Sequence, residues 1–417
     1  MNISIICSVL FLFIFSFPII GPLNSSHISM LLIITYSACN IDSWKYLKKI
    51  TSSYIFLFTL LLLILFSIYS ILITLLLYQY DFTIIKTIIN NLISFIICVL
   101  FVSLLFYKNN KKDISLDKIF VSILIAQSVI IITMLISPDI RYFIQSFIRT
   151  DEELRRMAVY DGVRGLGLSG SIAFGLAITM GLLSLIFMKW ISENKSISIF
   201  LKFTLFLISF IASLSAGRTA ILGYLLGCTF FLSRKVKITS LINLLLSICY
   251  MSLIIGICIY LLNDNEYLHK VANRYINYAF QPILNFINTG SFSVSSLNSL
   301  NNMYFFPENT STWFIGDGKY TSDEGFYYKN TDSGYMRFLL FFGIIGSLIP
   351  YFGFLFFCFY VIKKSKESRL LFSLVIIMAL IFHYKAEVIF FNVAYMKIIY
   401  IYGFYYIYKQ FFKNKTI

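Results

Sequence analysis

The sequence is poor in charge, and this limits what kind of protein it can be. Asp, Glu, Lys and Arg together make up 13% of the 417 residues, whereas 59% are hydrophobic and the mean hydropathy is +0.83. So little charge in a chain of this length excludes a soluble globular protein. The predicted fold class is therefore an all-α polytopic membrane protein, whose apolar helices cross the lipid bilayer.

The side chains that usually bind metals are also scarce. All seven cysteines lie in apolar segments, so they predict neither a disulfide framework nor a metal site. The three histidines, His27, His269 and His383, lie far apart in the chain. The loops predicted to face outward contain no Asp-x-Asp or histidine cluster of metal-ligand type. We therefore expect a protein that needs no metal and no other cofactor.

Apolar segments predict about 12 transmembrane spans and no separate soluble domain. They lie at about 3–20, 28–41, 53–78, 88–107, 119–137, 168–188, 197–215, 219–232, 238–262, 337–361, 370–384 and 390–408. Residues 1–20 lack a basic region and a cleavage site, so we interpret them as an uncleaved span. Because no low-complexity linker interrupts the chain, residues 1–417 are expected to form a single integral membrane domain.

The basic residues predict the orientation of these spans. More than half of them fall in six short polar islands, and the positive-inside rule places all six islands in the cytoplasm together with both chain ends. The net charge of +15 is then a topology signal, so we expect the lipid bilayer and no nucleic acid as a partner.

Two long loops, 138–167 and 263–336, are predicted to lie on the side of the membrane opposite the cytoplasm; the resemblance described below makes these the periplasmic loops. Loops of this length without linker composition are usually functional. The first contains five arginines and no lysine, whereas most lysines lie in the cytoplasmic islands. A guanidinium group is a planar fork that suits bidentate contact with phosphate. The ammonium group of lysine lacks this geometry. The outer face is thus a candidate anion-binding face.

Within the first loop, the arginines have alternative interpretations. Arg149, Arg155 and Arg156 flank or follow Asp151-Glu152-Glu153, so they could belong to one solvated, internally paired helix, or they could bind substrate. Arg164 stands apart and is followed by Gly165-Leu166-Gly167-Leu168-Ser169-Gly170. Such a flexible entry to a span lets backbone N–H groups approach a ligand. We therefore favour Arg164 as an anion-binding residue.

Arg218 interrupts the longest apolar stretch. Residues 197–232 are too long for one span and suit two, so we expect a hairpin with Gly217 and Arg218 at its tip. One interpretation is an interfacial arginine that reaches lipid phosphate. The other is an anion-binding arginine beside a helix N-terminus, whose free N–H groups also favour negative charge.

The second loop has a helical part and an acidic end. Apolar residues between His269 and Asn288 recur at helical spacing, which predicts a helix on the membrane surface or over the mouth of the bundle. The loop ends with Asp332-Ser333-Gly334-Tyr335-Met336-Arg337 before the next span. Asp332 could be an N-cap, or it could be a general base at a dry rim beside arginines.

These features together resemble the O-antigen polymerase and O-antigen ligase superfamily. The resemblance rests on Arg164-Gly165 with Gly167 and Gly170, on Ser215-Ala216-Gly217-Arg218-Thr219, and on the long loop that ends at Asp332-Ser333-Gly334-Tyr335 before a span with Gly343 and Gly346. It implies a GT-C-like glycosyltransferase of the bacterial inner membrane that acts on polyprenyl-diphosphate-linked oligosaccharide at the periplasmic face. A chain-length regulator protein is a further possible partner in such systems.

The resemblance also implies roles for individual residues. Arg164 and Arg218 would hold the diphosphate, and Asp332 would deprotonate or orient the acceptor hydroxyl. Arg337, Tyr335, Arg156 and Arg155 would contribute to substrate binding. An Arg-x10-Gly pattern that occurs in both long loops of some polymerases is incomplete here: Arg156 and Gly167 fit the spacing, but Arg274 is followed by Asn285.

Three alternatives to a polymerase follow from the same features. Ligases of the superfamily have a histidine at the end of the long loop, where this chain has Asp332, so polymerase is favoured over ligase. A polysaccharide flippase or exporter is also compatible with twelve spans. A non-catalytic membrane assembly partner is the third. The stretch His383-Tyr384-Lys385-Ala386-Glu387 and Lys397 within a span are left without an assigned role.

Overall fold

The computed structural model describes residues 3–21, 23–109, 115–158, 162–171, 173–232, 266–290, 300–322 and 324–413. This part of the chain is mostly α-helical, with one two-stranded antiparallel sheet of β1 (Pro18–Ile20) and β2 (Leu23–Asn24). The chain divides into two compact units, each built from two separate stretches. Unit 1 comprises Met1–His27 and Ser115–Val294, and unit 2 comprises Ile28–Ile114 and Ser295–Ile417.

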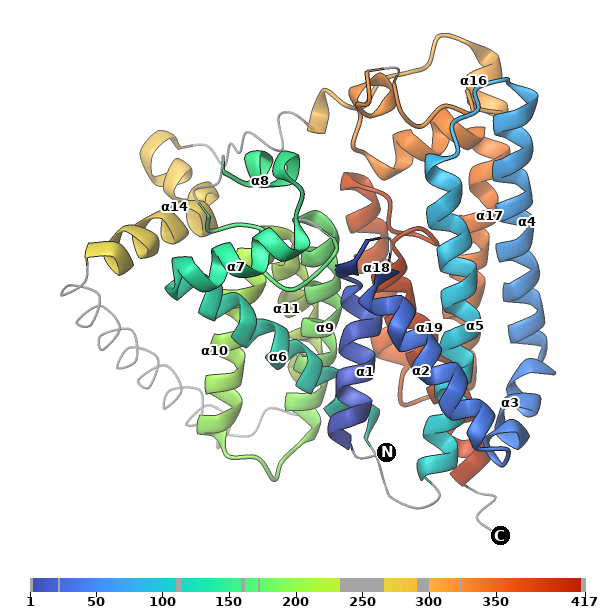
Figure 1. The fold of residues 1–417 in the computed structure, drawn as a ribbon, viewed down its shortest axis with the longest axis horizontal. Helices are drawn as coiled ribbons and strands as arrows, with labels where there is room; N and C mark the ends of the chain where they lie inside the picture. The colour runs from blue at the N-terminus through green and yellow to red at the C-terminus, as the bar shows by residue number, and fades with distance from the viewer. Residues whose placement is uncertain are drawn as a thin grey trace. The chain divides into compact units, whose positions relative to one another are not determined.

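Unit 1 is organised around one buried helix, α9 (Phe174–Glu193), which packs against α6, α10 and α11 (Figure 1). Glycines allow close packing here, since a Cβ atom on Gly223 would lie 1.9 Å from the carbonyl oxygen of Gly181. The helices of the unit are α1 (Ile3–Phe15), α6 (Leu116–Ile136), α7 (Pro138–Ile148), α8 (Asp151–Ala158), α9, α10 (Ile199–Ala216), η1 (Arg218–Ala220), α11 (Ile221–Gly227), α12 (Thr229–Leu232) and α14 (Glu266–Thr289).

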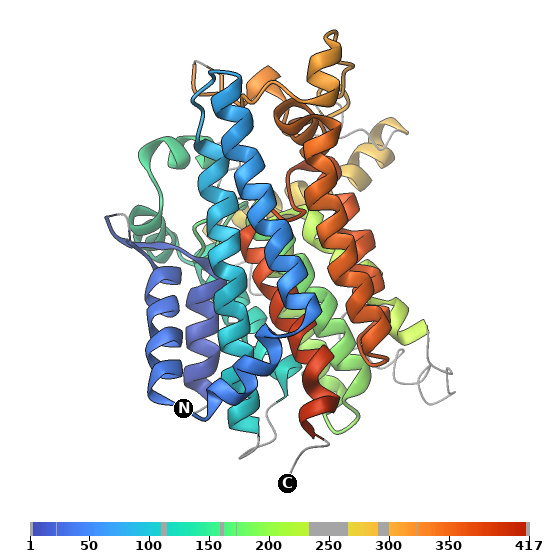
Figure 2. The ribbon, with the colours of Figure 1, turned by 90° about the vertical axis from the view of Figure 1, so that its right-hand side faces the viewer.

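Unit 2 places α4 and α5 side by side (Figure 2), and both contact further long helices, α4 contacting α17 and α5 contacting α19. Its core is aromatic: Phe66, Phe338, Phe341 and Phe342 are fully buried in one cluster. The helices are α3 (Ser43–Thr51), α4 (Tyr54–Leu76), α5 (Thr83–Asn109), α16 (Thr310–Phe314), η2 (Tyr328–Asn330), α17 (Gly334–Lys364), α18 (Arg369–Lys385) and α19 (Val393–Lys413). Helix α2 (Ser25–Cys39) begins at the end of the first stretch of unit 1 and continues in unit 2.

The helices confirm a helical membrane protein, and six of those described are long and apolar enough to cross a bilayer: α4, α5, α6, α9, α10 and α17. The predicted spans near 3–20, 28–41 and 219–232 form shorter apolar helices. Those near 370–384 and 390–408 form α18 and α19. The predicted span at 238–262 lies outside the described residues. The total of twelve and the GT-C-like architecture therefore stay predictions.

Helix α17 is interrupted at Gly343, where the backbone has φ 65° and ψ −175°. Such a break leaves carbonyl groups of the preceding turn without helical partners. The loop after α16 satisfies two of them, because Asp317 N–H donates to Leu340 O at 2.6 Å and Gly318 N–H donates to Phe341 O at 3.2 Å. The Tyr69 hydroxyl donates to Phe342 O at 3.0 Å. The loop after α16 is thus fixed to the broken helix.

We expect Gly343→Ala to destabilise the protein strongly. A Cβ atom at this position would lie 2.3 Å from Phe314 O in addition to adopting a positive φ, which costs about 1–3 kcal/mol by itself. Gly325→Ala is the matched control, because Gly325 has φ +80° and no heavy atom within 4 Å of its Cβ position. The temperature midpoint of aggregation in detergent should fall much further for Gly343→Ala than for Gly325→Ala. Equal midpoints would contradict the close packing of the loop against the helix break at Gly343.

Candidate active-site residues

The two arginine-bearing loops of unit 1 are joined by hydrogen bonds. The Ser215 hydroxyl donates to Val163 O at 2.8 Å, and Gly165 N–H donates to Ser215 O at 2.8 Å. Ser215 thus bonds the residues on both sides of Arg164, and Arg218 follows three residues later, just past the end of α10. The predicted hairpin with Gly217 and Arg218 at its tip is confirmed, since Gly217 is the C-cap of α10 and Arg218 begins η1.

The guanidinium of Arg218 contacts α14. Its Nη1 donates to Gln281 Oε1 at 3.0 Å, and its Cζ lies 5.1 Å from the centroid of the Tyr278 ring. The Tyr275 hydroxyl donates to Ile211 O at 2.7 Å, so α14 is also bonded to α10. The helix predicted between His269 and Asn288 is confirmed. It covers the arginine tip, where a neutral amide and an aromatic ring position Arg218 without neutralising its charge.

The segment 162–170, which contains Arg164, is held at both ends by other arginines. Arg141 Nη1 donates to Gly162 O at 3.0 Å, and Arg149 Nη1 donates to Gly170 O at 3.3 Å. Arg149 is 8% exposed and follows α7, so it does not belong to a solvated helix with Asp151. Burial lowers the pKa of its guanidinium, and Glu153 opposes this shift.

The other predicted arginines of the first loop lie on α8. Thr150 and Glu153 form a reciprocal capping box at its start, with Thr150 N–H donating to the Glu153 carboxylate at 3.1 Å. Arg155 is exposed on this helix, as the solvated-helix interpretation expected. Arg156 is also part of α8, and its side chain is not among the described ones.

We expect Ser215→Ala to weaken any activity that needs both arginines. The change leaves Val163 O without its donor in a buried place, which costs about 1–3 kcal/mol, and loosens the Arg164 loop from the Arg218 tip. Ser209→Ala is the control, because the buried Ser209 hydroxyl bonds Phe206 O within its own helix. If the polymerase expected from the sequence is correct, long polysaccharide on a gel should be lost or shortened for Ser215→Ala and retained for Ser209→Ala.

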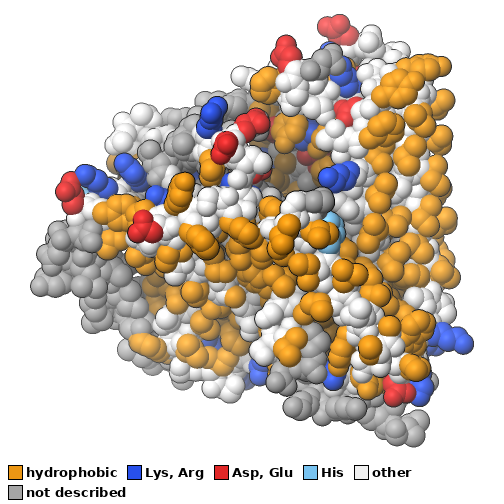
Figure 3. Space-filling view, in the orientation of Figure 1, with side chains coloured by type: hydrophobic (Ala, Val, Ile, Leu, Met, Phe, Trp, Pro, Cys, Tyr) orange, Lys and Arg blue, Asp and Glu red, His pale blue; other side chains and the backbone are white. Residues whose placement is uncertain are grey.

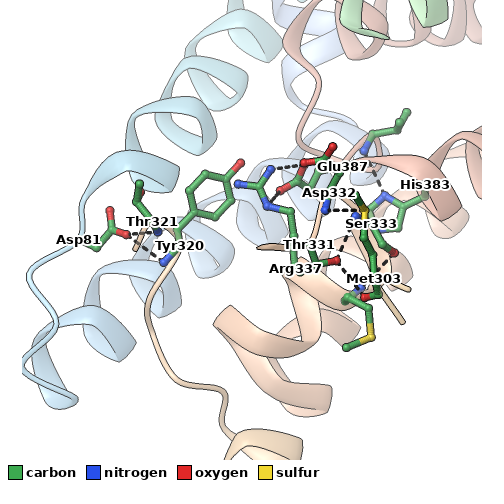
Figure 4. A network of polar contacts seen from close by, with 12 residues as sticks. Asp81, Met303, Tyr320, Thr321, Thr331, Asp332, Ser333, Arg337, His383 and Glu387 are labelled. Carbon is green, nitrogen blue, oxygen red and sulfur yellow. Dashed lines mark hydrogen bonds and ion pairs between the residues drawn. The ribbon is translucent and has the colours of Figure 1, made fainter. Parts of the chain in front are cut away.

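In unit 2, the residue that caps α17 is Ser333. Its hydroxyl accepts from Met336 N–H at 3.5 Å, so the interpretation of Asp332 as the N-cap is wrong. Asp332 N–H faces Met303 Sδ at 3.4 Å, and the Thr331 hydroxyl donates to Met303 O at 3.1 Å. Figure 4 shows the resulting network, in which the loop before α17 is tied down on both sides of Asp332.

Arg337 forms a buried ion pair that the sequence did not predict. Its Nε lies 2.7 Å from Glu387 Oε1 and its Nη1 lies 3.1 Å from Glu387 Oε2 (Figure 4), with both side chains 5% exposed. The guanidinium also contacts two tyrosine rings, with Cζ 3.7 Å from the centroid of Tyr320 and 3.8 Å from that of Tyr327, and these rings are inclined to each other by 66°. Arg337 therefore has structural partners on three sides.

The carboxyl group of Asp332 is placed beside this ion pair. Partial loss of water raises the pKa of Asp332 above its usual value, although the positive charges of Arg337 and Lys385 oppose the shift. The residue itself is exposed, so its carboxyl can meet a substrate. An accessible carboxyl with a raised pKa is a suitable general base, because its pKa is shifted toward the pH at which the reaction proceeds.

His383 and Tyr335 pack together behind this loop. His383 is fully buried, with Nδ1 accepting from Val388 N–H at 3.0 Å and Nε2 at 3.0 Å from the Tyr351 hydroxyl. The Tyr335 hydroxyl donates to Leu380 O at 3.0 Å, and its ring meets the imidazole edge-on. The histidine thus orders the turn before Val393, and both of its nitrogens are engaged.

No family model, curated protein or solved structure matches the chain. Within the described residues, no group of three or more His, Cys, Asp or Glu side chains could hold a metal ion. The candidate functional residues form two groups, the arginine loops of unit 1 and the Asp332 network of unit 2.

Sequence reasoning missed several residues that shape these groups. Glu387 was named without a role; an acid in a largely apolar hairpin needs a cationic partner, but the sequence did not show that Arg337 is that partner. Gln281 carried no signal, because neutral polar residues are common in helices of this kind, and Ser215 was noted only as part of the motif that contains Arg218. Arg141 and Arg149 were recognised as part of an arginine-rich loop, but the sequence could not show that their targets are the carbonyl groups of glycines 162 and 170.

Proposed function

We propose that the protein is a polysaccharide polymerase of the O-antigen type, a glycosyltransferase that uses polyprenyl-diphosphate-linked oligosaccharide as donor. The reaction transfers a growing glycan from the diphosphate to a sugar hydroxyl of a lipid-linked repeat unit. The observation that carries the proposal is the pair of hydrogen bonds through Ser215, which holds the Arg164 loop against the Arg218 tip. Two arginines from distant parts of the chain thereby belong to one local structure.

The chemistry of the donor makes such a pair useful. Cleavage of the bond between the anomeric carbon and the diphosphate oxygen leaves negative charge on the diphosphate. Fixed guanidinium groups stabilise that charge as it develops, and they need no reorganisation at the moment of reaction. The neutral contacts of Arg218 with Gln281 and Tyr278 support this role, since they orient the group and leave its positive charge for the ligand.

Asp332 is the proposed base that deprotonates or orients the acceptor hydroxyl. Its exposed carboxyl and its raised pKa support this assignment. Arg337 is assigned to the positioning of this region through Glu387 and not to direct substrate contact, because its guanidinium is enclosed by its partners. Tyr335, Arg155 and Arg156 remain predicted substrate-binding residues.

We expect Asp332→Asn to abolish polymerisation or lower its rate at least about 100-fold, the usual contribution of a general base. Glu308→Gln, a change in an exposed carboxylate of the same loop, should leave the rate unchanged. Since the base acts when deprotonated, activity should fall as pH drops through the pKa of Asp332. Lys385→Met removes a charge that lowers this pKa, so it should move the acid limb of the pH profile to higher pH.

Deletion of the gene followed by complementation tests the function as a whole. A polymerase deficiency converts the ladder of long surface polysaccharide on a gel into a single-repeat band. Loss of all surface glycan would instead indicate export or ligation. Ligase is the less favoured alternative, since His383 is buried with both ring nitrogens engaged and cannot act as the base of a ligase mechanism in this arrangement.

A further inference from the structure

Helix α7 has three distinct faces. At about 100° per residue, Arg141, Gln145 and Ile148 share one face, which packs on the unit, where α7 contacts α6 and β1. A second face presents the polar residues Asp139, Tyr142 and Ser146 to the outside. The third is an apolar stripe of Ile140, Phe143 and Phe147, at positions i, i+3 and i+7, with exposed fractions of 43%, 73% and 52%.

The position of α7 in the chain indicates what covers the apolar stripe. Helix α6 is long and apolar enough to cross the membrane and ends at Ile136, and α7 begins at Pro138 with Ser137 as its N-cap. A single residue therefore separates the end of a candidate span from an amphipathic helix, which has to lie at the membrane boundary. Hydrophobic side chains gather on the surface over α7 (Figure 3). The 11 residues of α7 are too few to cross a bilayer.

The same helix holds the loop that contains Arg164. Arg141 on its packed face binds Gly162 O, and Arg149, which ends the helix, binds Gly170 O. The two clamps lie on either side of Arg164 in the sequence. Gly162 has φ +71° and its Cβ position would be 2.7 Å from Arg141 Nη1, so the loop and the clamp are closely fitted. Movement of α7 relative to the lipid would therefore move the loop.

We propose that α7 is an interfacial helix whose stripe of Ile140, Phe143 and Phe147 is inserted into the lipid surface, and that it sets the depth of the Arg164 loop through Arg141 and Arg149. The lipid contact stands without any assumption about function. The consequence for Arg164 rests on the proposed function: the loop is held at the depth of lipid headgroups, where the diphosphate of a lipid-linked substrate lies. Arg141 and Arg149 are positioning residues in this arrangement.

Fluorescence quenching in vesicles tests the lipid contact. The full-length protein with its three native tryptophans replaced by phenylalanine would receive one new tryptophan, as Phe143→Trp, Phe147→Trp or, as the matched control on the polar face, Tyr142→Trp. The vesicles contain phosphatidylcholine brominated on the part of the acyl chain nearest the headgroup. We expect quenching at positions 143 and 147 and little at 142, which should instead be quenched by dissolved iodide.

The outcomes separate clearly. Equal quenching by iodide at positions 142 and 143, or no effect of brominated lipid at 143 and 147, would overturn the proposal. These readouts do not depend on enzymatic activity, so they remain decisive if the proposed polymerase function fails. If quenching follows the apolar stripe but the protein does not polymerise glycans, the interfacial helix stands and only its link to the substrate is lost.

A kinetic measurement tests the positioning role. Phe143→Ser combined with Phe147→Ser should raise the KM for lipid-linked substrate about tenfold, with kcat changed less than about twofold, because binding at the correct depth is weakened while the reacting groups stay intact. Tyr142→Ser should leave both values unchanged. Arg141→Ala should raise KM in the same way, and Arg141→Lys, which keeps one donor, should recover part of the loss. An unchanged KM in the double variant would contradict the positioning role.

Discussion

Replacing Arg218 with alanine is expected to abolish long polysaccharide while the protein still inserts into the membrane. The change removes one of two guanidinium groups proposed to stabilise the diphosphate leaving group, and loss of one such donor costs about 100-fold to 1,000-fold in rate. Arg164→Ala should have the same effect. Polysaccharide length on a gel, together with the amount of protein in the membrane, measures both outcomes.

Two further variants make this prediction specific. Arg218→Lys keeps the positive charge but loses the planar fork. If bidentate phosphate contact matters, this variant should retain only part of the activity. Arg274→Ala removes an exposed arginine from α14 in the same unit and should leave the polymer unchanged. Normal polymer length in Arg218→Ala or Arg164→Ala would remove that arginine from the mechanism.

Replacing Glu387 with alanine is expected to be the most destabilising single change among the acidic residues of unit 2. It leaves Arg337 buried without its anionic partner, which typically costs about 3–5 kcal/mol. The Tyr320 and Tyr327 rings would still contact the guanidinium, but they cannot replace a carboxylate that binds it through two nitrogens. The midpoint of thermal inactivation in detergent or nanodiscs should fall sharply.

The double variant Arg337→Met with Glu387→Met should recover much of this stability. Both charges are then absent, and methionine is flexible enough to fill the space between the tyrosine rings. Glu266→Ala is the control, because it breaks an exposed pair with Lys270 on α14 and should change stability by less than about 0.5 kcal/mol. If Glu387→Ala and Glu266→Ala had similar effects, the ion pair would not be a buried structural element.

The membrane class and much of the helical organisation could be predicted from the sequence. Long apolar runs have one stable solution in a bilayer, in which each backbone group is bonded within its own helix. The predicted segments near 53–78, 119–137 and 197–215 accordingly agree with α4, α6 and α10 within a few residues. The break in α17 was not predicted, because Gly343 is compatible with a continuous helix until the loop around Asp317 is packed against it.

The candidate site was predictable at the level of residue types and not of partners. An arginine within a long apolar stretch is costly to place in a membrane and is therefore a functional candidate, which identified Arg218. Which groups an arginine contacts depends on chain segments far apart in sequence: Gln281 is 63 residues from Arg218, and Glu387 is 50 residues from Arg337. The sequence also could not distinguish Asp332 from Ser333 as the cap of α17, since both residue types cap helices equally well.

Binding of undecaprenyl diphosphate and undecaprenyl monophosphate to the full-length protein in nanodiscs tests the central claim most directly. If Arg164 and Arg218 act on one diphosphate, the unaltered protein should bind the diphosphate lipid more tightly than the monophosphate lipid. Arg164→Ala and Arg218→Ala should each remove most of that preference, whereas Arg274→Ala should keep it. Equal affinity of the unaltered protein for both lipids, or a preference that survives in both arginine variants, would contradict the account.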